Sequence, residues 1–276
     1  MCIKQALSIS SSFLLLSFLA NFVVSQNIQR AGGTLVVAVP VQEGLVTCSD
    51  KRLYNDTAKT FRDDYVKIHQ VGDKALFVAT HTTGFLDRAT GKMDFDIFDL
   101  TSHYIAQHNF TADRIFFDGL KKDIRDQLLQ YLSKRKYQDW PATDVANNKL
   151  LFNLVFYAIP GNSIRSYSMS VFYEKAPTPV IYIQDPVTEI VRTPKLTGKG
   201  KEVMNYLASS PKLSSDPSIL RFDQSYFDAR KTTTSDAVNF SGKLFLLTNA
   251  AIPEAEVSST FDCALLSYHD GFKWLN

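Results

Sequence analysis

A threonine that follows two glycines is the residue in this sequence best placed to do chemistry. Gly32 and Gly33 precede Thr34, which opens a run of mostly β-branched residues. A threonine hydroxyl is a poor nucleophile at neutral pH and must lose its proton to a nearby base. An N-terminal α-amine has a pKa of about 8 and would lie on the same residue if the Gly33–Thr34 bond were cut. Alone, a threonine that starts a strand is also ordinary β-propensity.

Two charged residues follow Thr34 at sequence spacings that can be compared with known families. Asp50 closes the predicted strand 45–50, and Lys67 lies within the predicted strand 65–68. In this pattern the chain resembles the proteasome β-type branch of the N-terminal-nucleophile hydrolases. In that family a Gly-Thr bond is cut autocatalytically, an aspartate closes the second strand, and a lysine lies on the following strand. The spacing from Thr34 to Asp50 matches the family, and Lys67 comes one residue later than usual.

The resemblance implies a role for each of these residues. The positive charge of Lys67 would lower the pKa of the Thr34 hydroxyl, and Asp50 would keep Lys67 charged and oriented. None of this operates while Gly33 still acylates the amine of Thr34. Each charged residue could also be an ordinary surface charge, so the joint spacing behind the Gly-Gly pair is what favours a functional triad.

The resemblance also implies supporting groups farther along the chain. Backbone N–H groups of Thr80 and His81 would face the developing oxyanion. Asp236 and Ser241, in Ser-Asp-Ala and Ser-Gly, resemble the family's support motif beside the nucleophile. We therefore expect both side chains near Thr34.

Two residues depart from the family pattern. His81 stands where the family has a glycine, and Lys199 stands where it has the first serine of a Gly-Ser-Gly-Ser helix entry that assists catalysis. These departures leave a second interpretation open, an inactive protein on the same scaffold that acts as a binding or assembly module. A third is an unrelated secreted α+β protein.

The start of the chain has the pattern of an export signal. Lys4 precedes an apolar run to Val24, and compact residues lead up to Ser25, which is typical of a signal peptide cut after Ser25. The alternative is an uncleaved anchor over residues 6–24. The sequence thus predicts a signal at 1–25, a leader at 26–33, one domain at 34–276, and a secreted or periplasmic protein that is outside the membrane after signal cleavage.

Export changes how two cysteines are interpreted. Cys48 and Cys263 would enter an oxidising compartment and could form a disulfide. Two buried free thiols are an equally good interpretation of the sequence alone.

The elements that must position these residues alternate between groups of strands and groups of helices. The first strands are apolar on both faces, which indicates burial on both sides. We therefore predict an α+β fold, a four-layer αββα sandwich of two stacked, mainly antiparallel sheets between helical layers. Strands are expected at 34–39, 45–50, 65–68, 75–80, 151–157, 168–173, 180–184, 243–248 and 264–268, and helices at 96–108, 113–135, 201–208 and 219–230.

Composition narrows the function classes. The 276 residues are 45% apolar and 21% charged, as in an ordinary globular protein. A formal net charge of +2 provides no electrostatic case for nucleic acid. The five histidines form no zinc-type motif, so we expect neither a metal nor a cofactor. The expected partners are a peptide or small amide substrate and, by the resemblance, other copies of the chain in a homo-oligomeric ring.

Overall fold

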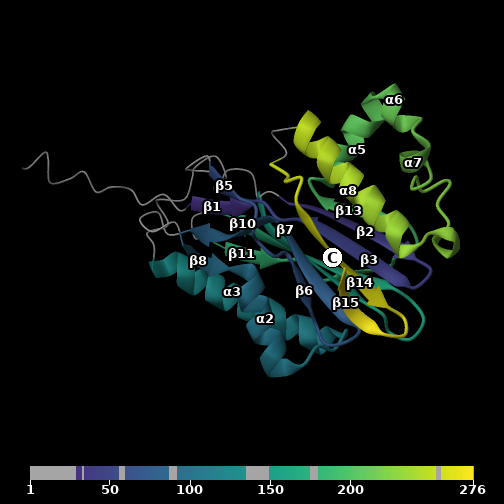
Figure 1. Cartoon of the computed structure of the whole chain (residues 1–276). Helices are drawn as coiled ribbons and strands as arrows, with labels where there is room; N and C mark the ends of the chain where they lie inside the picture. The colour runs from purple at the N-terminus through teal and green to yellow at the C-terminus, as the bar shows by residue number, and fades with distance from the viewer. Residues whose placement is uncertain are drawn as a thin grey trace, which may run out of the picture.

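Two β-sheets lie face to face between two layers of helices in the computed structural model of the chain (Figure 1). The structure describes residues 29–32, 34–55, 60–86, 92–134, 149–174, 180–252 and 256–275. The predicted α+β sandwich of four layers is confirmed. The expected signal at 1–25 lies outside the described residues, as do the first residues of the leader and Gly33.

The larger sheet is antiparallel, in the order β11-β10-β9-β7-β1-β4-β5, with β12 paired to β10 and with β6 and β8 paired to β7. Its strands are β1 (Gln29–Gly32), β4 (Leu53–Asn55), β5 (Thr60–Arg62), β6 (Ile68–Gln70), β7 (Ala75–Leu86), β8 (Met93–Asp96), β9 (Lys149–Ala158), β10 (Arg165–Glu174), β11 (Val180–Ile183) and β12 (Val187–Ile190). The leader therefore contributes an internal strand, β1, to this sheet.

The smaller sheet has the order β13-β2-β3-β14-β15 and is also antiparallel. Its strands are β2 (Leu35–Val41), β3 (Gly44–Asp50), β13 (Lys195–Gly198), β14 (Phe261–Ser267) and β15 (Gly271–Leu275). The chain passes from β1 in the larger sheet to β2 in the smaller sheet, and Thr34 lies at this crossing.

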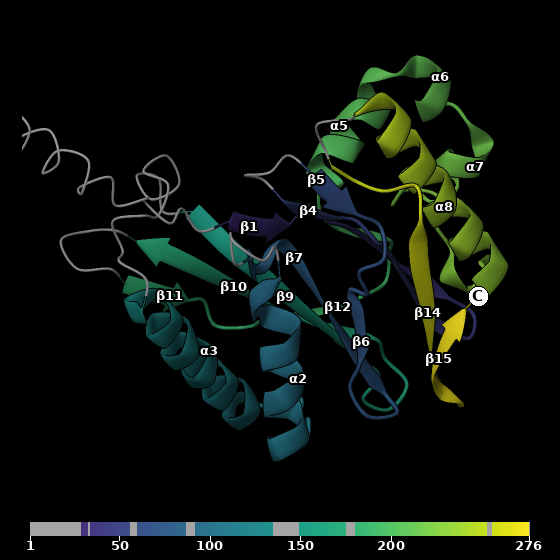
Figure 2. The same ribbon diagram turned by 60° about the vertical axis from the view of Figure 1, so that its left-hand side comes forward.

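Helices cover the outer face of each sheet (Figure 2). The helices α2 (Ile97–His108) and α3 (Arg114–Lys134) pack on the larger sheet. The smaller sheet is covered by α5 (Gly200–Ser209), α7 (Pro217–Leu220) and α8 (Thr234–Ala251), with the short α6 (Pro211–Ser214) and the 3-10 helix η2 (Ala229–Lys231) beside them. No helix among the described residues has the length and apolar character needed to cross a bilayer.

The alternation of β2 shows why its sequence is apolar throughout. Val36 and Ala38 lie in the core between the two sheets, whereas Val37 and Val39 lie in the core under α8. Side chains of a strand alternate between faces, so a strand with a sheet on one side and helices on the other must be apolar at every position.

Three expected elements differ in the structure. The expected strand 65–68 is displaced to β6, Ile68–Gln70, so that Lys67 lies just before the strand. The expected strand 243–248 is part of α8, which starts from a capping box between Thr233 and Asp236 and buries Ala237, Phe240 and Leu244 at helical spacing. Short apolar runs such as 244–247 do not separate strand from helix by themselves. The expected helix 219–230 is broken into α7 and η2, because side chains such as that of Asp223 hold tight turns between them.

A disulfide joins the two strands at the centre of the smaller sheet. Cys48 of β3 and Cys263 of β14 are directly opposite in the antiparallel register, and their sulfurs are bonded. The bond is buried in the core under α8. Of the two interpretations that the sequence left open, the structure therefore has the disulfide.

Loss of this cross-link should weaken the fold measurably. We expect Cys48→Ala combined with Cys263→Ala to lower the free energy of unfolding by about 2–5 kcal/mol, since removing a native disulfide typically has this effect. Urea unfolding of the oxidised wild type and of the double variant measures the difference. Equal midpoints and slopes would show that the thiols are unpaired in the secreted protein.

Candidate functional site

Asp50 connects the groups of the site, because its carboxylate accepts three hydrogen bonds. The turn between β2 and β3 returns the end of β3 to the beginning of β2, where Val36 is opposite Ser49. The fully buried Asp50 carboxylate accepts the backbone N–H of Leu35 at 2.8 Å through Oδ1. Through Oδ2 it accepts the Lys67 ammonium at 3.1 Å and the backbone N–H of Arg52 at 3.0 Å. The aspartate therefore joins the residue after Thr34 to Lys67.

Lys67 forms an ion pair with Asp50 in which both side chains are fully shielded from solvent. Burial lowers the pKa of Lys67, and the charge of Asp50 opposes this shift. Burial likewise raises the pKa of Asp50, which the charge of Lys67 and the backbone N–H groups oppose. A buried charge is retained only when it is paired and hydrogen-bonded, as this pair is. The Lys67 ammonium is thus held by the same carboxylate that binds the backbone N–H of Leu35.

Thr34 is only 1% exposed, and its backbone is held by neighbours on both sides. Its carbonyl oxygen accepts the backbone N–H of Lys199 at 2.9 Å, and the next amide, that of Leu35, is bound by Asp50. Gly198 makes this approach possible, because it has a φ of +70° and a Cβ there would lie 2.0 Å from the Thr34 oxygen.

The hydroxyl of Thr34 stands out among these groups. Its Oγ1 is buried and has no hydrogen-bond partner within the described residues. Buried hydroxyls are normally satisfied, because an unsatisfied one costs about 1–3 kcal/mol. This unsatisfied hydroxyl belongs to the residue before the amide that Asp50 binds, and a threonine nucleophile needs a hydroxyl that is not otherwise engaged.

Thr80 lies near Gly198, the glycine that contacts the Thr34 carbonyl, and His81 follows it in β7. A Cβ on Gly198 would lie 3.3 Å from the Thr80 side chain as well as 2.0 Å from the Thr34 oxygen. His81 has a left-handed backbone with a φ of 72°, although it lies within β7. This conformation favours glycine, the residue that the resembled family has there. The expected oxyanion role of the Thr80 and His81 backbone N–H groups stays a prediction.

The described contacts of the Asp236 and Ser241 side chains are with residues other than Thr34. Both lie on α8, whose first turn contacts the β2–β3 turn through a hydrogen bond of 3.1 Å between Thr234 Oγ1 and Glu43 Oε2. That turn is at the opposite end of β2 from Thr34. Asp236 caps its own helix and pairs with Arg221, and the Ser241 hydroxyl donates to the carbonyl of Ala237. Asp236 therefore lies at the end of β2 away from Thr34, which corrects its expected proximity, and the Ser241 hydroxyl is engaged within α8.

A second layer of groups, missed by the sequence analysis, surrounds Asp50. Arg52 makes a bidentate ion pair with Asp63, at 2.9 and 3.0 Å, and its Nη1 donates to the carbonyl of Val257. The hydrogen bond from Arg52 lowers the pKa of Asp63, and one from the buried Ser258 hydroxyl also lowers it. Ser258 lies between α8 and β14, so a serine between a long helix and the next strand was the available signal. These groups hold the Asp50 end of β3 in place.

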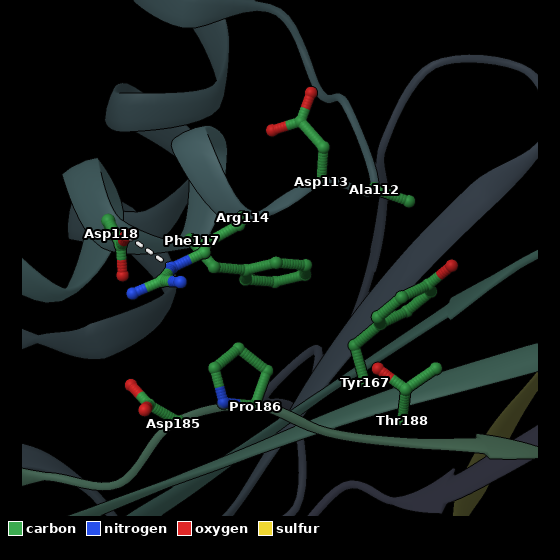
Figure 3. Close-up of a pocket in the computed structure, with 9 residues that line it drawn as sticks. All are labelled: Ala112, Asp113, Arg114, Phe117, Asp118, Tyr167, Asp185, Pro186 and Thr188. Carbon is green, nitrogen blue, oxygen red and sulfur yellow. Dashed lines mark hydrogen bonds and ion pairs between the residues drawn. The ribbon is translucent and has the colours of Figure 1, made fainter.

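A separate polar pocket of about 330 Å³ lies at the start of α3 (Figure 3). Its carboxylates are already engaged: Asp113 caps the helix at Phe116, Asp118 pairs with Arg114 and Lys121, and Asp185 also pairs with Lys121. Across the described ranges, no group of three or more His, Cys, Asp or Glu side chains is arranged to hold a metal ion.

Comparisons with known proteins add little beyond this geometry. No protein-family model matches the chain, and no curated protein matches it. Among solved structures, the chain is similar to the Anbu (Gly-1) mutant from Hyphomicrobium sp. strain MC1, with 14% identity and a TM-score of 0.48. The similarity covers 88% of this chain and 85% of that one.

Proposed function

We propose that the chain is an exported hydrolase of the N-terminal-nucleophile type that cuts its own Gly33–Thr34 bond and then cleaves peptides through Thr34. One observation carries the proposal: the buried Asp50–Lys67 pair is hydrogen-bonded to the backbone next to Thr34, and the Thr34 hydroxyl has no hydrogen-bond partner among the described residues. A structural ion pair alone does not need an unsatisfied hydroxyl beside it.

The proposed chemistry has two stages. In the first, Thr34 Oγ1 attacks the carbonyl carbon of Gly33, its proton passes by way of water to the Thr34 nitrogen as the bond to that nitrogen breaks, and water then hydrolyses the resulting ester. This leaves a free amine on Thr34. In the second stage that amine accepts the hydroxyl proton while the same oxygen attacks a substrate carbonyl. The proton then passes to the substrate nitrogen as the peptide bond breaks, and water hydrolyses the ester left on Thr34. Lys67 stabilises the developing negative charge in both stages, because it is fixed and shielded from water.

The leader supports a peptide as the substrate in preference to a small amide. Its residues Gln29–Gly32 lie as the strand β1 between β7 and β4, with Gly32 opposite both Thr82 and Tyr54. The chain segment on the acyl side of the Gly33–Thr34 bond is thus held by backbone pairing on both edges. A substrate held in the same way needs an extended peptide backbone.

The second candidate function is a non-catalytic binding or assembly module. Two observations favour it: Lys199, not a serine, lies beside Thr34, and the uncut leader already completes the larger sheet. In this case the amine of Thr34 would stay acylated, and the Asp50–Lys67 pair would only hold β2 and β3 in place.

Intact mass combined with N-terminal sequencing of the protein secreted from its own host separates the two functions. A chain that begins at Thr34 supports the hydrolase, because the Gly33–Thr34 bond has been cut. A chain that begins near Gln26 leaves the amine blocked and contradicts it. The same sample tests export, and light scattering measures the self-association that the resemblance implies.

The pH dependence of hydrolysis should show whether the reaction needs Lys67 in its charged form. It must be charged to lower the pKa of the Thr34 hydroxyl, and burial lowers its own pKa below the ordinary 10.5. As the pH rises through this lowered pKa the charge is lost, so we expect kcat/KM to fall at a pH below 10.5. Lys67→Arg keeps its charge to a pH of about 12 and should lack this alkaline limb, whatever its rate. A wild-type limb at or above pH 10.5 would contradict the assignment.

A further inference from the structure

A row of polar side chains crosses the larger sheet from the Thr34 site to the sheet edge. Thr80 of β7 is directly opposite Asn153 of β9, which is directly opposite Ser170 of β10. Gln184, just after β11, donates its backbone N–H to the carbonyl of Ser170 at 2.9 Å and continues the row. Directly opposite residues of antiparallel strands share one face, so Thr80, Asn153 and Ser170 point to the same side.

This side is the one that faces the smaller sheet. Val78, two residues before Thr80, and Val155, two residues after Asn153, both lie in the apolar core between the sheets. Side chains alternate along a strand, so Thr80 and Asn153 share that face. A polar row that continues an apolar core requires an explanation beyond packing.

Exposure increases along the row. Thr80 is fully buried, Asn153 and Ser170 are half-buried, and Gln184 is exposed. The Asn153 Oδ1 atom accepts the hydroxyls of Ser168 at 3.0 Å and Ser170 at 3.4 Å. The other end of this amide group makes no hydrogen bond to the described residues. The row thus has hydrogen-bonding capacity that the described part of the fold does not use.

The leader indicates which part of a substrate would meet the row. The residues before Thr34, the acyl side of the bond to be cut, lie in β1 against one edge of β7. The row leaves from the other edge of β7, toward β9 and β10. Because the two sides of a scissile bond extend away from the nucleophile in different directions, the row lies on the leaving side. Four neighbouring strands span about 14 Å, the length of about four extended residues.

We propose that the row of Thr80, Asn153, Ser170 and Gln184 binds the leaving side of a peptide substrate, a segment of about four residues with polar side chains. This inference rests on the proposed function, since it needs a bond cut at Thr34. The row binds this segment through hydrogen bonds to its backbone and side chains, and it makes the enzyme selective for an internal peptide bond over a small leaving group.

The test compares two substrates with the same acyl side. One has a small aromatic amine as the leaving group, and the other continues for four polar residues after the scissile bond. Asn153→Leu keeps the branched shape and the number of non-hydrogen side-chain atoms but removes both hydrogen-bonding ends. We expect it to lower kcat/KM for the extended substrate at least about tenfold more than for the short one. An equal effect on both substrates would overturn the inference.

Matched serines on one strand provide a second test if Asn153→Leu folds poorly. Ser170→Ala removes a member of the row, whereas Ser166→Ala removes a hydroxyl on the same strand and face outside the row. We expect only the first to lower the ratio of kcat/KM between extended and short substrates. Equal ratios for Ser170→Ala and wild type would contradict a role for this serine and hence for the row.

A binding measurement distinguishes failure of the proposed hydrolysis from failure of the row to bind a peptide. A fluorescent four-residue peptide of the leaving segment is titrated into the Thr34→Ala chain with and without Asn153→Leu, and fluorescence anisotropy is measured. Binding that weakens at least about tenfold with Asn153→Leu supports the row even if the wild type hydrolyses neither substrate. Affinity that is unchanged by Asn153→Leu overturns the row even if hydrolysis at Thr34 is active.

Discussion

Replacing Thr34 by alanine is expected to leave the Gly33–Thr34 bond intact and to lower peptide hydrolysis at least about a thousandfold. The hydroxyl is the only group of residue 34 that can attack a carbonyl carbon, and loss of a nucleophile removes most of the rate of an enzyme that acts through it. The measurements are intact mass for the cleavage and kcat/KM for hydrolysis. Thr34→Ser should retain both activities at a lower rate, because it keeps the oxygen.

Thr47→Ala is the matched control for this experiment. Thr47 is also fully buried and also has an Oγ1 atom without a partner among the described residues, but it lies in the middle of β3, opposite Ala38. We expect this variant to be cut and to hydrolyse peptides at a rate close to that of the wild type. A Thr34→Ala chain that is still cut between residues 33 and 34 would show that another protease removes the leader.

Replacing Lys67 by alanine is expected to have the largest effect on stability. The change leaves the Asp50 carboxylate buried without its opposite charge, and breaking a buried ion pair in this way typically costs about 3–5 kcal/mol. Urea unfolding measures the loss. Combined Lys67→Met and Asp50→Leu should recover part of the stability but none of the hydrolysis, because neither an uncompensated charge nor the ammonium is left.

An exposed ion pair of α3 serves as the control for Lys67. Lys122 and Asp126 are 2.6 Å apart, with side chains 76% and 54% exposed. Exposed pairs contribute about 0–1 kcal/mol, so Lys122→Ala should hardly shift the unfolding midpoint. A loss for Lys67→Ala as small as that for Lys122→Ala would mean that water reaches the Asp50–Lys67 pair in solution.

The part of the site that could be predicted from the sequence is the part built from neighbouring strands. Thr34 and Asp50 lie at the two open ends of one hairpin, so their separation along the chain determines their proximity, and the apolar strands imply the layers. The contacts that the sequence did not predict come from far along the chain. Ser258 reaches Asp63 from nearly two hundred residues later, and only the packing of α8 on the smaller sheet brings it there.

Asp236 is a residue that the sequence motif placed near Thr34 but that the structure places elsewhere. Its sequence surroundings match a support motif, yet the same residues form a capping box, and that box lies at the opposite end of β2 from Thr34. A short polar motif is thus less specific than the hydrophobic spacing that follows it. That spacing, with Ala237, Phe240 and Leu244 buried, was the better guide to the location of the motif.

The internal position of β1 has a consequence for the time course of activation. In the described part of the sheet, β4 and β5 connect to β7 through β1. Cutting the Gly33–Thr34 bond would therefore leave the leader held on both edges, in the place where the acyl side of a substrate must lie. The first product of the enzyme would be its own inhibitor, and hydrolysis would start with a lag that shortens on dilution and lengthens when synthetic leader peptide is added.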